Sequence, residues 1–85
     1  MTRLELEVRR WILRALDAAR GPLPEDTLKR SVRTAHPGVR FTDGDLNGHI
    51  RDCEELGCIA GTDDEVMGRI WDLTPKGRIR AQQLR

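Results

Sequence analysis

The feature that most constrains the fold is the helical spacing of apolar residues over the first twenty positions. The residues at this spacing are Leu4, Val8, Trp11, Ile12, Ala15 and Ala19. Intervals of three and four predict one helix with a single buried stripe. Leu6 and Leu13 fall on the opposite side of that helix. They need a second cover, which either the C-terminal segment or another subunit would supply.

Two further helices are expected before residue 57. Gly21-Pro22-Leu23-Pro24 stops the first helix and holds the chain extended, and Pro24 serves as the first residue of the second. The apolar stripe of the second helix is Leu28, Val32 and Ala35, and His36-Pro37-Gly38 ends it. The third helix begins at Thr42, where Thr42 and Asp45 resemble a capping box. Its inward side carries Leu46, Ile50 and Cys53, and Gly57 ends it.

The pattern after Gly57 changes from helical to alternating. Residues 58–62 and 67–73 predict two strands around a turn at residues 63–65, with Trp71 and Leu73 on one face and Ile70 and Asp72 on the other. Thr74 followed by Pro75 predicts a capped last helix over residues 75–84. The expected order is therefore helix, helix, helix, hairpin, helix. This is an α+β architecture that is mainly α.

Length and composition indicate one small domain spanning residues 1–85. No apolar run approaches the roughly 18 residues that cross a bilayer, and the first residues lack the plan of a signal peptide. We therefore expect a cytoplasmic protein with no membrane partner. In that reducing compartment Cys53 and Cys58 are expected to be thiols.

Two stretches resemble the winged-helix family of helix-turn-helix proteins. Residues 50–59, IRDCEELGCI, are similar to the end of the family's recognition helix and its entry into the wing. Residues 72–78, DLTPKGR, resemble the Leu-Thr-x-x-Gly-Arg step out of the wing in bacterial MarR-like, PadR-like and ArsR-like regulators. The resemblance implies a three-helix core, a two-stranded hairpin wing and a short C-terminal helix. The long dimerising helices of MarR-like and PadR-like regulators have no counterpart, so a dimer through the Leu6 and Leu13 face is only one possibility.

The resemblance implies that the third helix enters the major groove of double-stranded DNA. Helical geometry assigns its outward face to Gly44, Asn47, Gly48, Arg51 and Glu55. Asn47 suits an adenine edge and Arg51 a guanine edge. Phosphate contacts are expected from Arg40 and Arg69, with further candidates at Lys29, Arg30 and Arg33. This interpretation describes a small DNA-binding transcriptional regulator. Gly44 and Gly48 either are tolerated in the helix or let another backbone approach it closely.

The charge pattern favours a different partner. Residues 41–72 contain nine acidic residues and only two arginines, and both flanking segments are net basic. The acidic residues include Asp43, Asp45, Asp52, Glu54 and Glu55 on the third helix and Asp63, Asp64 and Glu65 at the wing turn. Because DNA affinity depends on cations that neutralise phosphates, these carboxylates oppose it. The alternative is a protein-interaction module that presents the acidic helix and wing to a basic protein.

Catalysis, metal binding and cofactors find little support in the sequence. No nucleophile elbow, phosphate loop or dinucleotide fingerprint occurs, so we expect neither an enzyme nor a cofactor. His36, His49, Cys53 and Cys58 have the composition of a zinc site but lack its characteristic spacing, and packing explains them equally. No metal site is therefore predicted. A Cys53–Cys58 redox switch is a further weak candidate, since no basic residue lies within two positions of Cys58.

Overall fold

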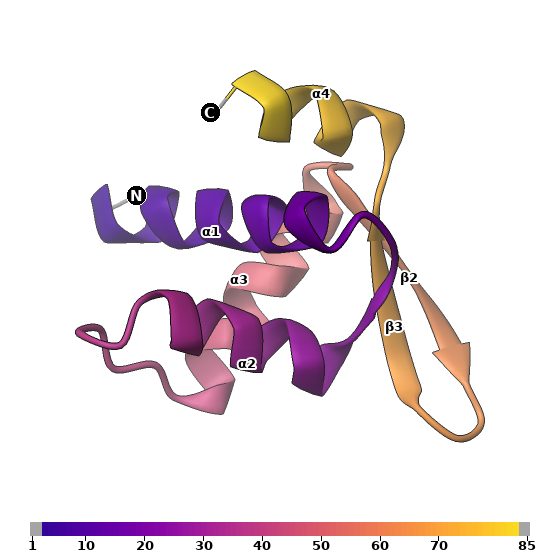
Figure 1. Cartoon of the computed structure of the whole chain (residues 1–85), viewed down its shortest axis with the longest axis horizontal. Coiled ribbons are helices and arrows are strands. Elements are labelled where there is room, and N and C mark those ends of the chain that lie inside the picture. The colour runs from indigo at the N-terminus through magenta and orange to yellow at the C-terminus, as the bar shows by residue number, and fades with distance from the viewer. Residues whose placement is uncertain (1–2, 84–85) are drawn as a thin grey trace.

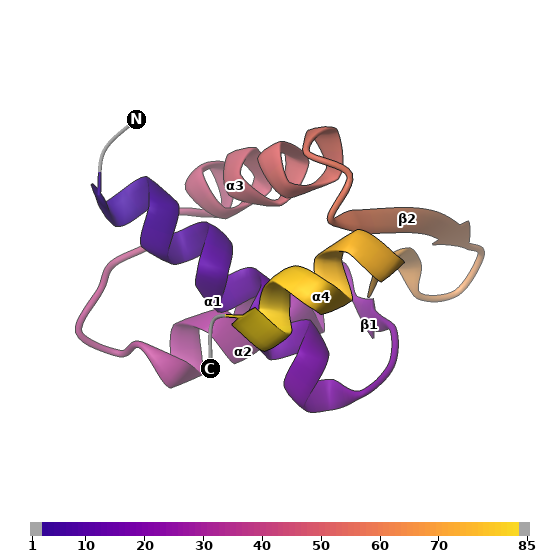
Figure 2. The same cartoon turned by 90° about the horizontal axis from the view of Figure 1, so that it is seen from above.

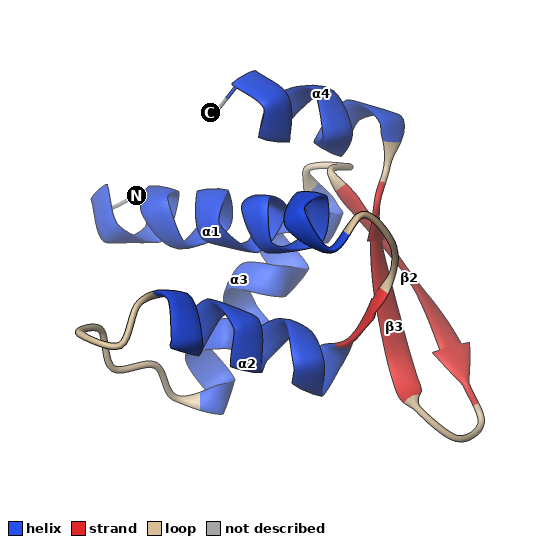
Figure 3. Ribbon diagram, in the orientation of Figure 1, coloured by secondary structure: helices blue, strands red, loops and turns tan. Residues whose placement is uncertain are grey.

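A computed structural model describes residues 3–83, and within them the predicted order of elements is confirmed with one short strand added (Figures 1 and 3). The elements are α1 (Arg3–Ala19), β1 (Leu23–Pro24), α2 (Glu25–Ala35), α3 (Asp43–Glu55), β2 (Ile59–Asp64), β3 (Gly68–Leu73) and α4 (Pro75–Gln83). The predicted end of the last helix at Leu84 lies outside the described residues. None of the helices in this part of the chain is long and apolar enough to cross a membrane.

Helix α1 is the centre of the helical layer and contacts α2, α3 and α4. Figure 1 shows α4 above α1 and α2 below it, with α3 behind, while the strands lie together at one end of the long axis. The view from above in Figure 2 places α4 across α1, between α3 and the C-terminal part of α1. The core lies where these helices meet the sheet. Its buried side chains include Ile12, Leu28, Leu46, Ile50, Ile59 and Trp71.

The buried face of α1 differs from the predicted stripe. Val8 and Ile12 are buried as expected, but Leu4 is 49% exposed and Ala19 is also exposed. Leu13 and Leu16 are buried in their place. The reason is that α4 packs against α1, so α1 also buries residues on the side that faces α4. Residues near its two ends remain exposed. The expectation that Leu13 needs a cover is therefore met within the chain, and Leu13 is not available to a dimer interface.

The sheet has three strands, whereas the sequence predicted two. Leu23 and Pro24 pair antiparallel with Trp71 and Ile70, and the strand order is β1-β3-β2. Two prolines flank Leu23 without conflict because β1 is an edge strand, where a missing N–H removes no hydrogen bond from the sheet interior. Pro24 also caps α2 and is not its first residue. Helix α2 buries Leu28 and Val32, but the third predicted stripe residue, Ala35, is exposed at its end.

The hairpin turn lies two residues later than predicted. Strand β2 continues to Asp64, because Asp63 lies opposite Arg69 in the antiparallel ladder and their side chains form an ion pair. The turn then comprises residues 65–67. The Asp64 side chain accepts hydrogen bonds from the backbone N–H groups of Val66 and Met67 at 2.8 and 3.0 Å. This hairpin, residues 59–73 with its turn, is called the wing below.

The two stretches that carry the family resemblance lie against each other. Gly57 ends α3 with a positive φ of 76°, and its carbonyl oxygen accepts a hydrogen bond from the Thr74 hydroxyl. Thr74 caps α4 as predicted, since its Oγ1 accepts from the Gly77 N–H at 3.1 Å. Residue 77 must be glycine, because a Cβ there would overlap the carbonyl group of Cys58. The exit from α3 and the start of α4 therefore form one packed junction.

Candidate functional site

The orientation of α3 follows from its capped N-terminus and its buried side. Thr42 Oγ1 accepts from the Asp45 N–H at 3.0 Å, and the Thr42 N–H donates to the Asp45 carboxylate at 3.2 Å. The predicted capping box is therefore confirmed. Hydrogen bonding of its carboxylate by the Thr42 side chain, and then by the Thr42 N–H, lowers the pKa of Asp45. Leu46, Ile50 and Cys53 are buried on the inner side, as predicted.

The opposite side of α3 is open to solvent. All members of the predicted outward face are exposed: Gly44, Asn47, Gly48, Arg51 and Glu55. Asn47 and Arg51 line a shallow pocket of about 320 Å³ together with Arg69 and Trp71 from β3. The structure thus brings together three of the predicted site residues. Arg40 is exposed in the link before α3 and does not line this pocket.

The two glycines of α3 have no close neighbours within the described chain. A Cβ at Gly48 would meet nothing within 4 Å, and one at Gly44 would meet only the Thr42 hydroxyl at 3.8 Å. No other segment of residues 3–83 therefore uses the narrow surface that these glycines create. That surface is available to a molecule outside the chain.

Arginines from other helices neutralise acidic residues at both ends of α3. Arg33 of α2 bonds the Asp43 carboxylate at 2.7 Å, and this contact lowers the pKa of Asp43. Arg9 of α1 bonds the Asp52 carboxylate at 2.9 Å. The Arg9 side chain is only 17% exposed, so this second pair is the less screened by solvent. Sequence reasoning missed both pairs, because the partners lie 10 and 43 positions apart.

Arg69 joins α3 to the wing. Its guanidinium bonds Glu54 at 3.3 Å and Asp63 at 3.0 Å, and it lies 5.1 Å from the centre of the Trp71 ring. The hydrogen bond to Asp63 is the main reason that the pKa of Arg69 is raised. The sequence predicted that Arg69 contacts phosphate. In the structure its guanidinium is bonded to the carboxylates of Glu54 and Asp63.

The acidic surface predicted for α3 is consequently much reduced. Asp43, Asp52 and Glu54 are each paired with an arginine. Lys29, a predicted phosphate contact, is buried and lies 3.9 Å from Glu25. The exposed carboxylates with no ion pair recorded within residues 3–83 include Asp45, Glu55, Asp64 and Glu65.

The two cysteines and His36 occupy packing positions. Cys53 and Cys58 are buried free thiols. Burial, followed by the proximity of Cys58, raises the pKa of Cys53 to about 12. The thiol therefore stays protonated at neutral pH, whereas disulfide exchange needs the thiolate. The His36 ring stacks on Trp11 with 3.6 Å between ring centroids, and no group of three or more metal-ligand side chains occurs within residues 3–83.

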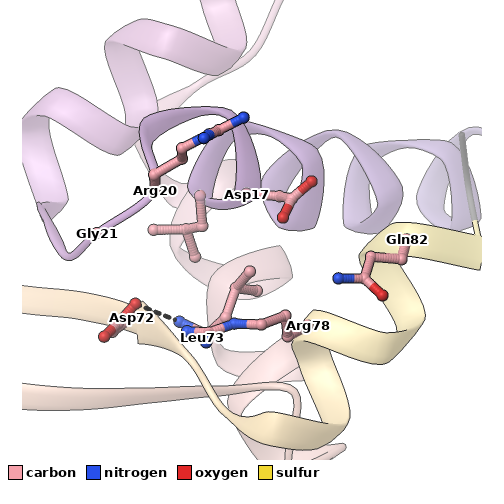
Figure 4. Close-up of a pocket in the computed structure, with 8 residues that line it drawn as sticks. Asp17, Arg20, Gly21, Asp72, Leu73, Arg78 and Gln82 are labelled. Atoms are coloured by element: carbon pink, nitrogen blue, oxygen red, sulfur yellow. Dashed lines mark hydrogen bonds between the residues drawn. The ribbon is translucent and has the colours of Figure 1, made fainter.

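A second polar pocket, of about 340 Å³, lies between the end of α1, β3 and α4 (Figure 4). It is lined by two arginines, Arg20 and Arg78, and two carboxylates, Asp17 and Asp72. The Asp72 carboxylate accepts a hydrogen bond from the Leu73 N–H at 2.8 Å. Since the four side-chain charges balance, the pocket offers no net attraction to an anion or a cation.

The helical core, the capped α3 and the three-stranded sheet with its hairpin together make this a winged-helix domain. Among solved structures, the chain is similar to the circadian clock associated protein Pex from Anabaena, with a TM-score of 0.68 and 26% sequence identity. The match covers 91% of this chain and 70% of that chain. No family model and no curated protein sequence matches the chain.

Proposed function

We propose that this winged-helix domain binds double-stranded DNA through α3 and acts as a transcriptional regulator comparable to the MarR-like, PadR-like and ArsR-like proteins. One observation carries the proposal. Asn47 and Arg51 stand exposed on a face of α3 whose neighbouring acids Asp43, Asp52 and Glu54 are held by arginines. Similarity to a clock-associated winged-helix protein supports a regulatory role. The proposal assigns binding, and not catalysis, to this domain.

The proposed contacts follow from side-chain chemistry. The Asn47 amide suits the N6 and N7 edge of adenine, and the Arg51 guanidinium suits O6 and N7 of guanine. Gly44 and Gly48 let the DNA backbone approach the helix, since no side chain stands there. Arg40 and Arg30 are exposed and supply phosphate contacts. Asp45 and the unpaired glutamates repel phosphates, so affinity is expected to be modest for the isolated domain.

Fluorescence anisotropy with a mixed-sequence duplex of about thirty base pairs tests the proposal, since non-specific binding lies near ~10⁻⁴–10⁻⁶ M and weakens steeply with salt. We expect such binding at low salt and its weakening in Arg51→Ala. The matched control is Arg14→Ala, which removes an exposed arginine from the α1–α2 side of the molecule. Equal loss in both variants, or no binding at low salt, would contradict DNA recognition by α3.

A basic protein is the second candidate partner. The observation that favours it is the group of exposed carboxylates on α3 and the wing turn that have no ion pair within residues 3–83, notably Glu55 and Glu65. Binding of such a partner should weaken in Glu55→Gln with Glu65→Gln and be unaffected by Arg51→Ala. DNA binding should respond in the opposite way, because removing carboxylates favours it.

A further inference from the structure

A narrow apolar groove lies on the side of α1 that faces α4 and the end of α3. Its volume is about 210 Å³, below the range of about 300–1,000 Å³ for small-molecule pockets. Leu13 is buried beneath it, while Leu6 and Leu56 line it with 48% and 50% of their surfaces exposed. Figure 2 looks onto α1, α3 and α4, which together with the link between α3 and β2 contribute its lining residues. A groove of this size accommodates one or two apolar side chains.

The rim of the groove is basic. Arg10 of α1 and Arg80 of α4 line it and are exposed, with no ion pair recorded for either within residues 3–83. Arg9 also lines it but is bonded to Asp52. Lys76 donates to the Leu56 carbonyl oxygen at 2.8 Å. The groove therefore favours an occupant that combines apolar side chains with negative charge.

The wing turn has the complementary chemistry. Val66 and Met67 are 92% and 57% exposed at its tip, and Asp63, Asp64 and Glu65 precede them. The two hydrogen bonds to the Asp64 carboxylate hold the turn in one conformation. Such preorganisation reduces the entropy lost on docking.

We propose that the wing tip of one copy docks into the α1–α4 groove of a second copy, with Val66 and Met67 against Leu6 and Leu56 and Glu65 beside Arg10 and Arg80. Within one copy this contact cannot form, because Figures 1 and 2 place the wing tip at the opposite end of the long axis from the N-terminal half of α1. The observations that carry this contact do not depend on the proposed DNA binding.

The geometry defines the kind of assembly. The two surfaces differ, so each contact joins the wing of one copy to the groove of another. A pair that forms a single contact leaves a free wing and a free groove, through which association extends beyond a dimer. A hairpin tip buries less area than the roughly 1,200–2,000 Å² of stable interfaces, so assembly is weak and depends on protein concentration.

Sedimentation velocity of the full chain from micromolar to millimolar concentration tests the proposal. The wild type should show a rising average mass, while a groove variant, Arg10→Glu with Arg80→Glu, and a wing variant, Glu65→Gln with Val66→Ser, should each remain monomeric. Arg14→Glu, which reverses a charge on the other side of α1, should associate like the wild type. All the substituted positions are exposed, and circular dichroism checks that each variant is folded.

Mixing the two variants distinguishes this contact from a symmetric one. The groove variant keeps an intact wing and the wing variant keeps an intact groove, so an equimolar mixture should form a one-to-one pair and nothing larger. A wing variant that still associates would mean that two grooves pair with each other, and the proposal would be wrong. A wild type that stays monomeric at millimolar concentration would also overturn it.

Discussion

At the residue scale, Gly77 and Thr74 determine how the chain leaves the wing. Thr74 caps α4 and also donates its hydroxyl hydrogen to the carbonyl oxygen of Gly57. Gly77 allows the first turn of α4 to lie directly on the carbonyl group of Cys58. The Leu-Thr-x-x-Gly pattern that resembles regulator sequences therefore has a packing explanation in this chain. It positions α4 against the end of α3 and leaves recognition to other residues.

Substitution of Gly77 measures this packing. We expect Gly77→Ala to lower the free energy of unfolding by about 1–3 kcal/mol, the usual cost of inserting atoms into a closely packed site. Urea unfolding followed by circular dichroism gives the value. The matched control is Gly38→Ala, where a Cβ meets nothing within 4 Å and a surface change stays within about 0.5 kcal/mol. Similar values for the two variants would show that the junction relaxes freely.

The capping box makes stability depend on pH. Hydrogen bonds from Thr42 lower the pKa of Asp45 below its ordinary value of 3.8. A carboxyl whose pKa is lower in the folded state adds stability above its unfolded-state pKa, and this stability is lost as pH falls through the folded-state pKa. We expect Asp45→Asn to reduce the loss of stability that acid causes in the wild type, as measured by urea unfolding from neutral pH into the acid range.

The double variant identifies the cause of that pH dependence. Thr42→Ala removes the side-chain hydrogen bond, the largest cause of the lowered pKa of Asp45, and keeps the backbone one; it should cost about 1 kcal/mol at neutral pH. In this background Asp45→Asn should change the acid dependence less than it does in the wild type. Asp43 and Asp64 also have lowered pKa values, from Arg33 and from the turn N–H groups respectively, and their contributions should remain in every variant. An unchanged effect of Asp45→Asn would point to a cause other than the cap.

At the element scale, α3 combines a buried side that belongs to the core with an outer side that contains two glycines. A glycine within a helix costs up to about 1 kcal/mol relative to alanine. Nothing in the described chain requires Gly48 to lack a side chain. The helix would therefore be more stable with alanine at Gly48, and the surrounding residues leave room for it. Without side chains at the two glycines, a partner can approach the outer side of α3 closely.

Substitutions at Gly48 separate stability from binding. Gly48→Ala should raise the free energy of unfolding by as much as about 1 kcal/mol. Gly48→Leu should leave thermal stability unchanged or higher and strongly reduce DNA binding, because its side chain would fill the surface on which the DNA backbone is proposed to lie. Thermal unfolding and fluorescence anisotropy measure the two effects. Full DNA binding by Gly48→Leu would exclude a close approach at this position.

At the scale of the whole molecule, acidic and basic surfaces are separated from each other. The acidic wing turn lies at one end of the long axis, and the cations Arg10 and Arg80 line the α1–α4 groove. A protein with a near-neutral total of +1 therefore presents complementary surfaces to other copies of itself. Both proposals involve the wing region, DNA binding beside it on α3 and self-association at its tip.

Because of this shared region, DNA and self-association should compete. Adding duplex to the associated wild type is expected to release copies from the assemblies, so that the average number of protein copies per particle falls. Sedimentation with a labelled duplex measures this number. The groove variant Arg10→Glu with Arg80→Glu should still bind DNA, since its substitutions lie away from α3's outer face. An assembly that keeps its size while it binds duplex would show that DNA on α3 leaves the wing tip free to dock.

The order of elements could be predicted from the sequence because its signals are local. Thr42 and Asp45 lie three residues apart, Thr74 immediately precedes its helix, and Gly57 follows one. Helical spacing also placed Leu46, Ile50 and Cys53 inside and Asn47 and Arg51 outside. These features depend on geometry within a few residues, which the sequence by itself determines.

Tertiary structure decided what depends on distant neighbours. The packing of α4 on α1 buried Leu13 and left Leu4 exposed, and the pairing of Leu23 with Trp71 added the third strand. Most importantly, the structure pairs Arg9 with Asp52 across 43 positions of sequence, a contact that could not be predicted from the spacing of charges on α3. Spacing along a chain defines which side chains share a helix face, but only the folded arrangement brings charges from different helices to within bonding distance.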